Sequence, residues 1–304
     1  MVDIIIVNWN SGDYIKDCIT SVFIPENESI LGKVIIVDNN SADESLQLVL
    51  QRPQIEIIKN AENVGFAKAC NQGFLAGNAE YVLFLNPDTQ LQRNTLSDCL
   101  AYMEGHKETD IVGCQLLDDD GKISPSCARF PTPKTFFYDA LGLSKIAPRL
   151  FTPAILMTDW DHKESRFVDQ LTGAFMFMRR KVFERLGYFD ERFFVYYEEL
   201  DFSLRLHKMG GRSFFNAAIK AHHTGGGTTN KVKAYRLFLT LRSRLLYAKK
   251  NFSVSGCAFV SFTTFIIEPF SRLLFLIGSA RFKEIKDLAK AYILLIKSRR
   301  IFSK

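Results

Sequence analysis

The sequence predicts an α/β fold in which a mostly parallel sheet is flanked by helices and followed by a helical C-terminal segment. Two observations predict it. Over the first third of the chain, short runs rich in β-branched residues alternate with helical patterns, as in βαβ units with parallel strands. Beyond residue 230 the composition becomes basic and apolar. With 47% hydrophobic and 24% charged residues, the chain has the composition of a globular protein rather than a disordered one.

The elements of the first third are short and well bounded. Each apolar run is followed by polar residues, and a serine or aspartate precedes two of the helical patterns. The predicted strands are Val2–Val7, Lys33–Val37, Ile55–Ile58 and Tyr81–Leu85. The predicted helices are Ser11–Phe23, one that begins at Asp43, and Gly65–Ala76.

The middle of the chain is less regular. An Asp-Gly pair within Leu116–Ser126 predicts a hairpin. Residues 127–165 contain four prolines and predict a long irregular segment. The remaining predicted elements are an extended stretch over Val168–Met178, a short helix from Lys181, a helix over Glu198–Met209 and a strand over Arg212–Phe215.

Polar residues follow the predicted strands repeatedly, and the sequence Asn86-Pro87-Asp88 is one example. Proline cannot donate to a sheet ladder, so the strand ends there and the carboxylate lies at its carboxyl end. Ligands of open α/β sheets bind at that edge, although the same residue types also form ordinary turns. Neither GxGxxG after the first strand nor GxxxxGK[ST] occurs, so any nucleotide must be held by side chains such as Asp38.

The net charge of +6 conceals an asymmetry. Residues 231–304 contain 16 lysines and arginines against 3 acidic residues, whereas residues 1–230 contain 23 against 30. We therefore predict a domain over 1–230 and a basic segment over 231–304 whose partner is anionic, either nucleic acid or a membrane surface. Six cysteines without a CxxC pair suit a reducing, cytoplasmic compartment.

The basic segment favours lipid over nucleic acid because its apolar content is high. Its uncharged run Cys257–Ile267 ends at Glu268 and Pro269, short of the ~20 residues that span a bilayer. A later helical pattern is apolar on one face and cationic elsewhere, which predicts an interfacial helix. The alternative is that this helix packs on the body as an ordinary core helix. The apolar face comprises Ile285, Leu288, Tyr292, Leu295 and Ile296.

Three groups of residues suggest chemistry on a metal-bound diphosphate. Asp88 offers oxygen ligands for Mg²⁺ or Mn²⁺, and the pair His222-His223 offers imidazole. The sequence Glu198-Glu199-Leu200-Asp201 offers a general base at a helix start.

These motifs, in this order over residues 1–230, resemble the inverting GT-A-fold glycosyltransferases of family 2 and, within them, the rhamnosyltransferase-like group. The motifs are Val7-Asn8-Trp9-Asn10, Val37-Asp38-Asn39-Asn40-Ser41, Asn63-Val64-Gly65-Phe66-Ala67 with Asn71-Gln72-Gly73, Leu85-Asn86-Pro87-Asp88, Leu171-Thr172-Gly173-Ala174, Gly187-Tyr188-Phe189-Asp190-Glu191, Phe194 to Asp201, and His222.

The resemblance implies a donor site for a nucleoside-diphosphate sugar. Asp38 accepts from the pyrimidine ring N–H, and Asn8 and Asn10 line the base and ribose. Asp88 ends the family's DxD motif and holds Mg²⁺ or Mn²⁺ against the diphosphate, with His222 as a further ligand in preference to His223. The remaining donor-binding residues are Asn63, Gly65, Asn71 and Asn86.

The resemblance also implies that Glu199 is the base that deprotonates the acceptor hydroxyl. Glu198 and Asp201 shape the acceptor site, and Gly173 lets the substrate approach the backbone. Arg242 and Arg244 either contact an acceptor diphosphate or are simply solvated.

The chain departs from the family pattern at two places. Asn86-Pro87-Asp88 replaces DxD, so one anionic ligand becomes neutral. Glu198-Glu199 replaces a frequent Glu-Asp pair, so the base is one methylene longer.

The sequence therefore predicts an inverting, metal-dependent glycosyltransferase of surface polysaccharide biosynthesis, peripheral on the inner face of the cell membrane. The first choice of donor is dTDP-L-rhamnose, with a UDP-sugar as the other choice, and the acceptor is a lipid-linked glycan. A sugar-nucleotide pyrophosphorylase would need a glycine-rich, basic loop after the first strand, which is missing. A non-catalytic nucleotide-binding membrane scaffold would lose Glu199 or Asp88, and both are present. The sequence leaves open the acceptor, the linkage and whether a homo-oligomer forms.

Overall fold

The computed structural model of the chain describes residues 1–225 and 233–298. Packing divides them into two units. Unit 1 comprises Met1–Ala128, Trp160–Phe194 and residues 198–225, and unit 2 comprises Arg129–Asp159, Val195–Tyr197 and residues 233–298. The predicted domain boundary between residues 230 and 231 lies outside the described residues.

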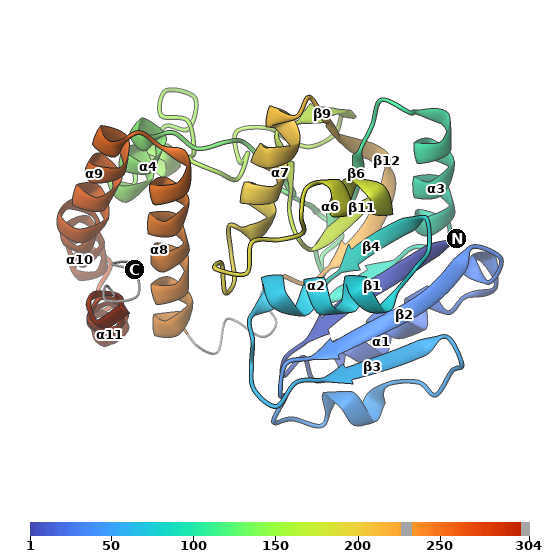
Figure 1. The fold of residues 1–304 in the computed structure, drawn as a ribbon. Coiled ribbons are helices and arrows are strands. Elements are labelled where there is room, and N and C mark those ends of the chain that lie inside the picture. The colour runs from blue at the N-terminus through green and yellow to red at the C-terminus, as the bar shows by residue number, and fades with distance from the viewer. Residues whose placement is uncertain (226–232, 299–304) are drawn as a thin grey trace. The chain divides into compact units, whose positions relative to one another are not determined.

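Unit 1 is built on one large mixed sheet, which confirms the predicted α/β class (Figure 1). The strand order is β3-β2-β1-β4-β11-β6-β12-β5, with β7 beside β6 and β9 beside β12; β8 and β10 form a separate pair. The first four strands in this order are parallel, whereas β11 runs antiparallel to both of its neighbours. The strands are β1 (Val2–Asn8), β2 (Leu31–Asp38), β3 (Ile55–Lys59), β4 (Tyr81–Leu85), β5 (Thr89–Leu91), β6 (Ile111–Leu117), β7 (Ile123–Ser124), β8 (Cys127–Ala128), β9 (Arg166–Val168), β10 (Gln170–Leu171), β11 (Phe175–Arg179) and β12 (Ser213–His223).

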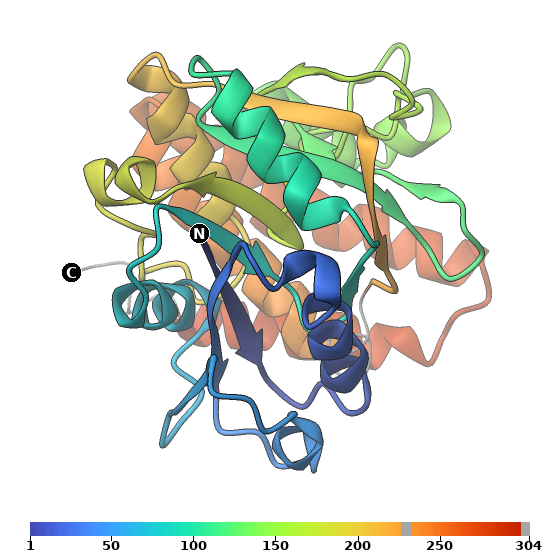
Figure 2. The same ribbon diagram turned by 90° about the vertical axis from the view of Figure 1, so that its right-hand side faces the viewer.

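Helices cover both faces of this sheet because β1 is apolar on both sides. Val2, Ile4 and Ile6 pack with the helices α1 (Tyr14–Val22) and α3 (Thr95–Gly105). On the other face, Gly73 of α2 (Phe66–Ala76) lies so close to Ile5 that a Cβ would come within 2.6 Å of its Cγ2 atom. Figure 2 shows α2 on one side of β1 and α1 on the other. The helices α6 (Arg180–Arg185) and α7 (Glu198–Lys208) complete that second face through a cluster of aromatic rings formed by Phe74, Phe84, Phe183, Phe189 and Phe202.

Two predictions for unit 1 have clear outcomes. The hairpin is confirmed, since β7 pairs antiparallel with β6 through Leu117 and Ile123. The helix predicted from Asp43 is wrong, because only a short 3₁₀ turn, η2 (Ser45–Leu48), forms there. Asp43 accepts hydrogen bonds from the backbone N–H and hydroxyl of Ser45, and such local bonds compete with helix formation.

Unit 2 consists mainly of helices, including two in the segment that we predicted to be irregular. The first of these, α4, begins with a capping box in which the Thr132 and Thr135 side chains bind each other's backbone N–H, and Pro133 occupies its first turn. The described helices of unit 2 are α4 (Pro133–Ala140), α5 (Leu143–Ile146), α8 (Lys233–Asn251), α9 (Val254–Phe262), the π-helical turn η4 (Thr263–Ile267), α10 (Glu268–Gly278) and α11 (Glu284–Ser298).

The predicted stop at Glu268 and Pro269 is wrong. The elements α9, η4 and α10 form one continuous helix over Val254–Gly278, which by length and composition alone could cross a membrane. Pro269 is accommodated because it lies in the first turn of α10, directly after the π-helical turn. We call this element the long helix.

The apolar face that we predicted for α11 is mostly internal to unit 2. Leu288 and Leu295 are buried, and Leu295 packs with Leu241 and Leu245 of α8. The Tyr292 hydroxyl donates to the carbonyl of Thr264 over 3.0 Å. This helix therefore packs as a core helix of unit 2, and much of its apolar face is not available to lipid, although Ile296 is exposed; packing on the body of unit 1 stays a prediction.

Candidate active site

The carboxyl ends of β1, β2 and β4 are neighbours at one edge of the sheet in unit 1. Asn8 at the end of β1 pairs in register with Asp38 at the end of β2. Beyond the end of β4, the backbone N–H of Asn86 donates to the carbonyl of Ala174 over 3.0 Å. Ala174 directly precedes β11, which is the next strand in the sheet. The polar edge predicted from the sequence is therefore formed by residues of several strands.

The Asp38 carboxylate is buried and held by neutral donors. Its Oδ1 atom accepts from Asn8 Nδ2 at 2.8 Å and from the Ser41 hydroxyl at 2.6 Å, and its Oδ2 atom accepts from the Ser41 backbone N–H at 3.2 Å. These bonds fix the orientation of the carboxylate without neutralising its charge. Asp38 is thus a fixed acceptor at the strand end.

Asn8 and Asn10, which we predicted to line the base and ribose, both bond to the loop after β2 in this structure. Asn8 is fully buried, and besides Asp38 its Nδ2 atom contacts Ser45 Oγ at 2.9 Å, so it lies behind the carboxylate. Asn10 has a left-handed backbone with a φ of 52°, and its Oδ1 atom accepts from the Ala42 N–H at 2.7 Å. Asn10 therefore ties the loop after β1 to the loop after β2.

Three further residues that we predicted to bind the donor have structural contacts: Gly65 and Asn71 contact the segment that precedes α7, and Asn63 bonds to Gly65. A Cβ on Gly65 would lie 2.5 Å from the Phe194 carbonyl oxygen, which is too close for a side chain. Gly65 also has a φ of 91°, a backbone conformation that favours glycine. Asn63 Oδ1 accepts from the Gly65 N–H at 3.0 Å. Asn71 is buried and exchanges two hydrogen bonds with the backbone of Phe189.

Asp88 lies beside His223, not His222. The Nε2 atom of His223 is 3.3 Å from Asp88 Oδ1, whereas the Nε2 atom of His222 is 3.3 Å from Asp119 Oδ1. Successive residues of a strand point to opposite faces, and β12 pairs with β5 so that His223 lies opposite Thr89. The geometry therefore reverses the predicted preference between the two histidines.

The pair Asp88 and His223 fits a divalent cation that takes part of its coordination from a ligand. A carboxylate oxygen and an imidazole nitrogen converge there, and both suit Mn²⁺ or, for the oxygen, Mg²⁺. In residues 1–225 and 233–298, no group of three or more His, Cys, Asp or Glu side chains is placed to hold a metal ion. A cation at Asp88 would thus need further oxygen ligands from the substrate or water.

Glu198 and Glu199 begin α7, and their carboxyl groups contact each other; Glu198 is buried and Glu199 is partly buried. Burial raises the pKa of both, and the neighbouring Glu199 carboxylate raises that of Glu198 further. Hydrogen bonds from the backbone N–H groups of Glu199, Gly173 and Leu200, and from Glu198, act in the opposite direction on Glu199. We therefore assign the shared proton to Glu198 and the carboxylate to Glu199.

Glu199 is connected to the polar edge by its contact with Gly173. A Cβ on Gly173 would lie 3.8 Å from Glu199 Oε1, and the next residue, Ala174, accepts the hydrogen bond from Asn86. The Oε2 atom of Glu199 is buried and has no hydrogen-bond partner among the described residues. A buried carboxylate oxygen without a partner is costly, and such groups are concentrated at functional sites.

Asp201, which we predicted to shape the acceptor site, is an internal residue of α7 in this structure. Its side chain is completely buried, and its Oδ2 atom accepts from Arg205 Nε at 2.9 Å, one helical turn further along α7. Its role in shaping the acceptor site stays a prediction. The Arg205 guanidinium also donates to the Tyr188 carbonyl at 2.6 Å, so the pair fixes α7 to the preceding loop.

In unit 2, the structure contradicts the solvated reading of Arg244, and contact with an acceptor diphosphate stays a prediction. Its guanidinium is buried and forms an ion pair with Glu268, over the ring of Phe136. Arg242, on the same helix, is half-buried, and this desolvation lowers its pKa. Its predicted contact with an acceptor diphosphate stays a prediction.

Sequence reasoning missed two contributors to the polar edge. The sequence favours His222 over His223 as the metal ligand, because only the register of β12 on β5 shows which histidine lies beside Asp88. Ser41 supplies two of the donors that hold Asp38. Its signal was the spacing of three residues after an aspartate, which is typical of side chains that close a turn.

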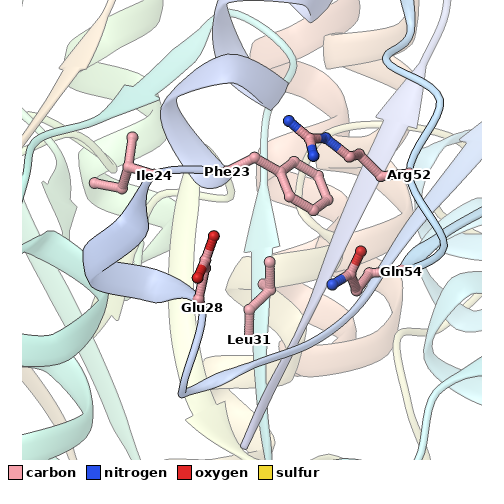
Figure 3. A pocket seen from close by; sticks show the side chains of 6 residues that line it. All are labelled: Phe23, Ile24, Glu28, Leu31, Arg52 and Gln54. Carbon is pink, nitrogen blue, oxygen red and sulfur yellow. The ribbon is translucent and has the colours of Figure 1, made fainter.

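A hollow elsewhere in unit 1 is not part of this site. Figure 3 shows that it is lined by Phe23, Ile24, Glu28, Leu31, Arg52 and Gln54. Leu31 begins β2 and Gln54 directly precedes β3, so the hollow lies at the amino ends of these strands, opposite the edge that carries Asp38. None of the candidate catalytic residues lines it.

Comparisons with known proteins are consistent with this geometry. Residues 3–187 match the model of the family described as Glycosyl transferase family 2. The chain is 26% identical over 249 residues to the N-acetylglucosaminyl-diphospho-decaprenol L-rhamnosyltransferase of Mycobacterium tuberculosis (strain CDC 1551 / Oshkosh), covering 76% of this chain and 80% of that protein. It is 25% identical over 269 residues to rhamnosyltransferase WbbL of Escherichia coli (strain K12), covering 83% of this chain and 97% of that protein.

Among solved structures, the mannosyltransferase PcManGT from Pyrobaculum calidifontis, in complex with GDP-Man and Mn²⁺, has a similar fold. It superposes with a TM-score of 0.56 at 15% identity and covers 97% of this chain and 86% of that one. At this identity the similarity concerns the fold alone, and it agrees with the predicted GT-A-like class.

Proposed function

Because the chain belongs to glycosyl transferase family 2, we propose that it is an inverting glycosyltransferase that moves a hexose from a nucleoside-diphosphate sugar to a hydroxyl of a lipid-linked glycan. L-Rhamnose from dTDP-L-rhamnose is the first candidate, since two relatives are rhamnosyltransferases. A UDP-sugar is the other candidate. The observation that carries the proposal is the partly buried Glu199 carboxylate. Its buried Oε2 atom has no partner among the described residues, and the carboxylate is joined through Gly173 and Ala174 to the edge that holds Asp88.

Asp38 would recognise the base of the donor. A thymine or uracil ring has one N–H, and a fixed carboxylate is a strong acceptor for it. The bonds from Asn8 and Ser41 hold that carboxylate in place before the donor binds, so little side-chain entropy is lost on binding. Asn8 is therefore a positioning residue rather than a contact of the base.

Asp88 and His223 would hold Mg²⁺ or Mn²⁺ against the diphosphate. When bound, such a cation offsets the negative charge that develops on the leaving diphosphate. Asn86 replaces the first carboxylate of DxD and is held by its backbone to Ala174, so its contribution is to shape the turn that presents Asp88.

Glu199 would act as the general base. The acceptor hydroxyl oxygen attacks the anomeric carbon from the side opposite the diphosphate, and its proton passes to the Glu199 carboxylate. A bond from the anomeric carbon to the acceptor oxygen forms while the bond to the phosphate oxygen breaks, and the nucleoside diphosphate leaves with the electron pair. A single displacement of this kind inverts the anomeric configuration. Proton transfer to a positioned base typically contributes about 10²–10⁴-fold to the rate.

A lipid-linked acceptor is supported by the relative from Mycobacterium tuberculosis, whose name gives a diphospho-decaprenol as the acceptor. It is also consistent with the basic, apolar composition of residues 231–304. We place the enzyme on the cytoplasmic face of the cell membrane in the assembly of a surface polysaccharide. The long helix, which by length and composition alone could cross a membrane, agrees with a membrane location.

The test is the binding of a panel of dTDP- and UDP-sugars to the full chain with and without Mg²⁺ or Mn²⁺, repeated with Asp88→Ala. We expect one sugar nucleotide to bind in a metal-dependent manner and to lose that dependence in the variant. Binding that ignores both the metal and Asp88 would refute the metal-assisted mechanism. Transfer to a polyprenyl-diphosphate glycan, followed by determination of the anomeric configuration of the product, then tests inversion.

The two histidines provide a matched control within this test. His223→Ala should weaken metal-dependent donor binding, whereas His222→Ala, one residue away, should leave it within a few-fold of the original because His222 faces Asp119. A larger loss of metal-dependent donor binding in His222→Ala than in His223→Ala would instead support His222 as the metal ligand.

A further inference from the structure

The long helix of unit 2 has its polar side inward and its apolar side outward. Thr263, Thr264 and Glu268 are buried. The outward side carries Phe262, Ile266, Phe270 and Leu274, whose exposed fractions are 53%, 46%, 65% and 70%. These four residues recur at intervals of four, so they form one stripe along the helix. A surface helix of a protein in water shows the opposite arrangement.

The orientation of this stripe is fixed by polar contacts within unit 2. Glu268 forms ion pairs with the buried Arg244 and with Arg272, and the Ser271 hydroxyl donates to the carbonyl of Ala140. Rotation of the helix that hid the apolar stripe would pull Glu268 away from Arg244 and leave a buried charge uncompensated, which is strongly unfavourable. The outward apolar side is therefore a stable feature of the unit rather than a side-chain rearrangement.

The same contacts argue against a helix that crosses a bilayer. A lone spanning helix is surrounded by lipid, whereas the long helix has one side packed on α8 and α4 through ionic and polar groups. The stripe lies on the side away from these contacts, and Phe275 and Ile277 near the end of the helix are exposed as well. An apolar stripe on one side of a helix suits a position in the plane of the membrane, at the boundary between headgroups and acyl chains.

Cationic residues flank the long helix at both ends. Exposed Lys249 precedes it, and exposed Arg281 and Lys283 follow it, with Phe282 exposed between them. The exposed lysines Lys286 and Lys290 continue this character on α11, and residues 231–304 carry a net charge of +13. Charge of this sign and an apolar stripe together complement an anionic lipid surface.

We propose that the outward stripe of the long helix, Phe262, Ile266, Phe270 and Leu274, binds in the plane of an anionic lipid bilayer. This deepens the proposed function and rests on it in one respect, because a lipid-linked acceptor lies at such a surface. The surface differs from the one suggested by the sequence, since the apolar face of α11 is mostly occupied by α8.

The experiment is co-sedimentation of the full chain with vesicles of phosphatidylethanolamine and phosphatidylglycerol, compared with phosphatidylcholine vesicles. The test variant is Phe270→Ser/Leu274→Ser. The control is Leu75→Ser/Met209→Ser, which changes two residues of unit 1 that are 66% and 55% exposed. We expect the test variant to bind anionic vesicles at least about tenfold more weakly, the control to bind normally, and the wild type to prefer anionic vesicles. A thermal melt checks that both variants are folded.

Three outcomes would overturn the proposal. Equal vesicle binding by test and control variants would remove the stripe from the interaction. If the test variant still binds vesicles but no longer self-associates, the stripe contacts a second copy of the chain rather than lipid. Wild-type protein that alkaline carbonate cannot extract from the vesicles would indicate a spanning helix.

Donor binding, measured without vesicles on the same proteins, separates this proposal from the proposed function. Normal vesicle binding by a wild-type protein that binds no sugar nucleotide would refute the function and leave the membrane surface intact. Normal donor binding by a wild-type protein that binds no vesicles would refute the membrane surface and leave the proposed function intact.

Discussion

Two clusters of carboxyl groups with low solvent exposure differ in their partners: Glu198 and Glu199 begin α7 in unit 1, and Glu268 lies inside the long helix of unit 2. Glu268 at the start of α10 is paired with two guanidinium groups. Burial alone would raise its pKa, but Arg244 and Arg272 outweigh that effect and lower it. Glu198 and Glu199 at the start of α7 have no ion pair with a cation among the described residues, and burial raises the pKa of both.

The difference distinguishes a structural carboxylate from a catalytic one. The charge on Glu268 is compensated, so it holds helices together and has no remaining capacity for chemistry. Glu199 has a buried oxygen without a partner among the described residues, which costs stability unless a substrate hydroxyl occupies the position. The N-terminus of α7 favours negative charge on Glu198 and Glu199, whereas Glu268 lies inside the long helix, where Arg244 and Arg272 compensate its charge.

The largest expected effect is on turnover in Glu199→Gln. The amide has the same size but cannot accept the proton of the acceptor hydroxyl, so kcat should fall by about 10²–10⁴-fold. Donor binding should stay within a few-fold of the original. Steady-state transfer assays and donor titration measure the two quantities. The matched control is Glu184→Gln, at an exposed glutamate of α6, which should leave both unchanged. A fall of less than tenfold in Glu199→Gln would exclude it as the base.

Glu268→Ala should have the largest effect on stability. Removal of the carboxylate leaves Arg244 buried without a counter-ion, and breaking a buried pair in this way costs about 3–5 kcal/mol. Glu284→Ala is the control, because Glu284 pairs with Arg281 at the surface of the same unit. Glu284 also pairs with exposed Lys233, and such solvent-exposed pairs contribute little to stability. Denaturant unfolding of unit 2, followed by hydrogen exchange of α8 and α10 amides, measures both. Similar losses in the two variants would show that burial of the pair is unimportant.

The pH dependence of transfer should report the raised pKa of Glu199. The base works only when deprotonated, so kcat/KM should fall on acidification, at a pH above that expected for an ordinary glutamate. A hydrogen bond from Glu198 lowers the pKa of Glu199. Glu198→Ala removes that bond and should move the acid limb to higher pH, whereas Glu198→Gln keeps a donor and should move it less. A limb at the ordinary position of a glutamate, unchanged in Glu198→Ala, would contradict the assignment of roles.

Much of the sheet edge could be predicted from the sequence because its signals are local. Buried parallel strands are short β-branched runs, and their polar ends mark one edge whatever the details of packing. The strand predictions of the first third of the chain, and the placement of Asp38, Asn86 and Asp88 at strand ends, rest on those signals alone.

The parts that could not be predicted depend on contacts between distant segments. A helical period of 3.6 shows that a face is apolar but not what lies across from it. The sequence therefore predicts a lipid-facing side on α11, but much of that side packs on α8. The uncharged run Cys257–Ile267 is too short to span a bilayer, yet the helix that contains it continues and exposes an apolar stripe that includes Phe270. The choice between His222 and His223 required the register of β12 on β5. Asp201 is an exception, because its spacing of four from Arg205 on a helix was a local sign of an ion pair.

The smallest expected effect, in Arg272→Ala, sharpens the comparison between the two carboxyl clusters. Arg272 binds Glu268 Oε1 at 2.7 Å, yet its side chain is 43% exposed. Water can replace its bonds, and the buried Arg244 keeps its pairing with Glu268, so the loss should be about 0–1 kcal/mol. Arg244→Ala should cost several times more, because it leaves Glu268 buried beside a single, partly solvated cation. Denaturant unfolding of the two variants and their double variant measures the coupling. Equal losses of stability in the two single variants would mean that the buried Arg244 stabilises Glu268 no more than the exposed Arg272 does. A buried ion pair would then not be what distinguishes Glu268 from Glu199.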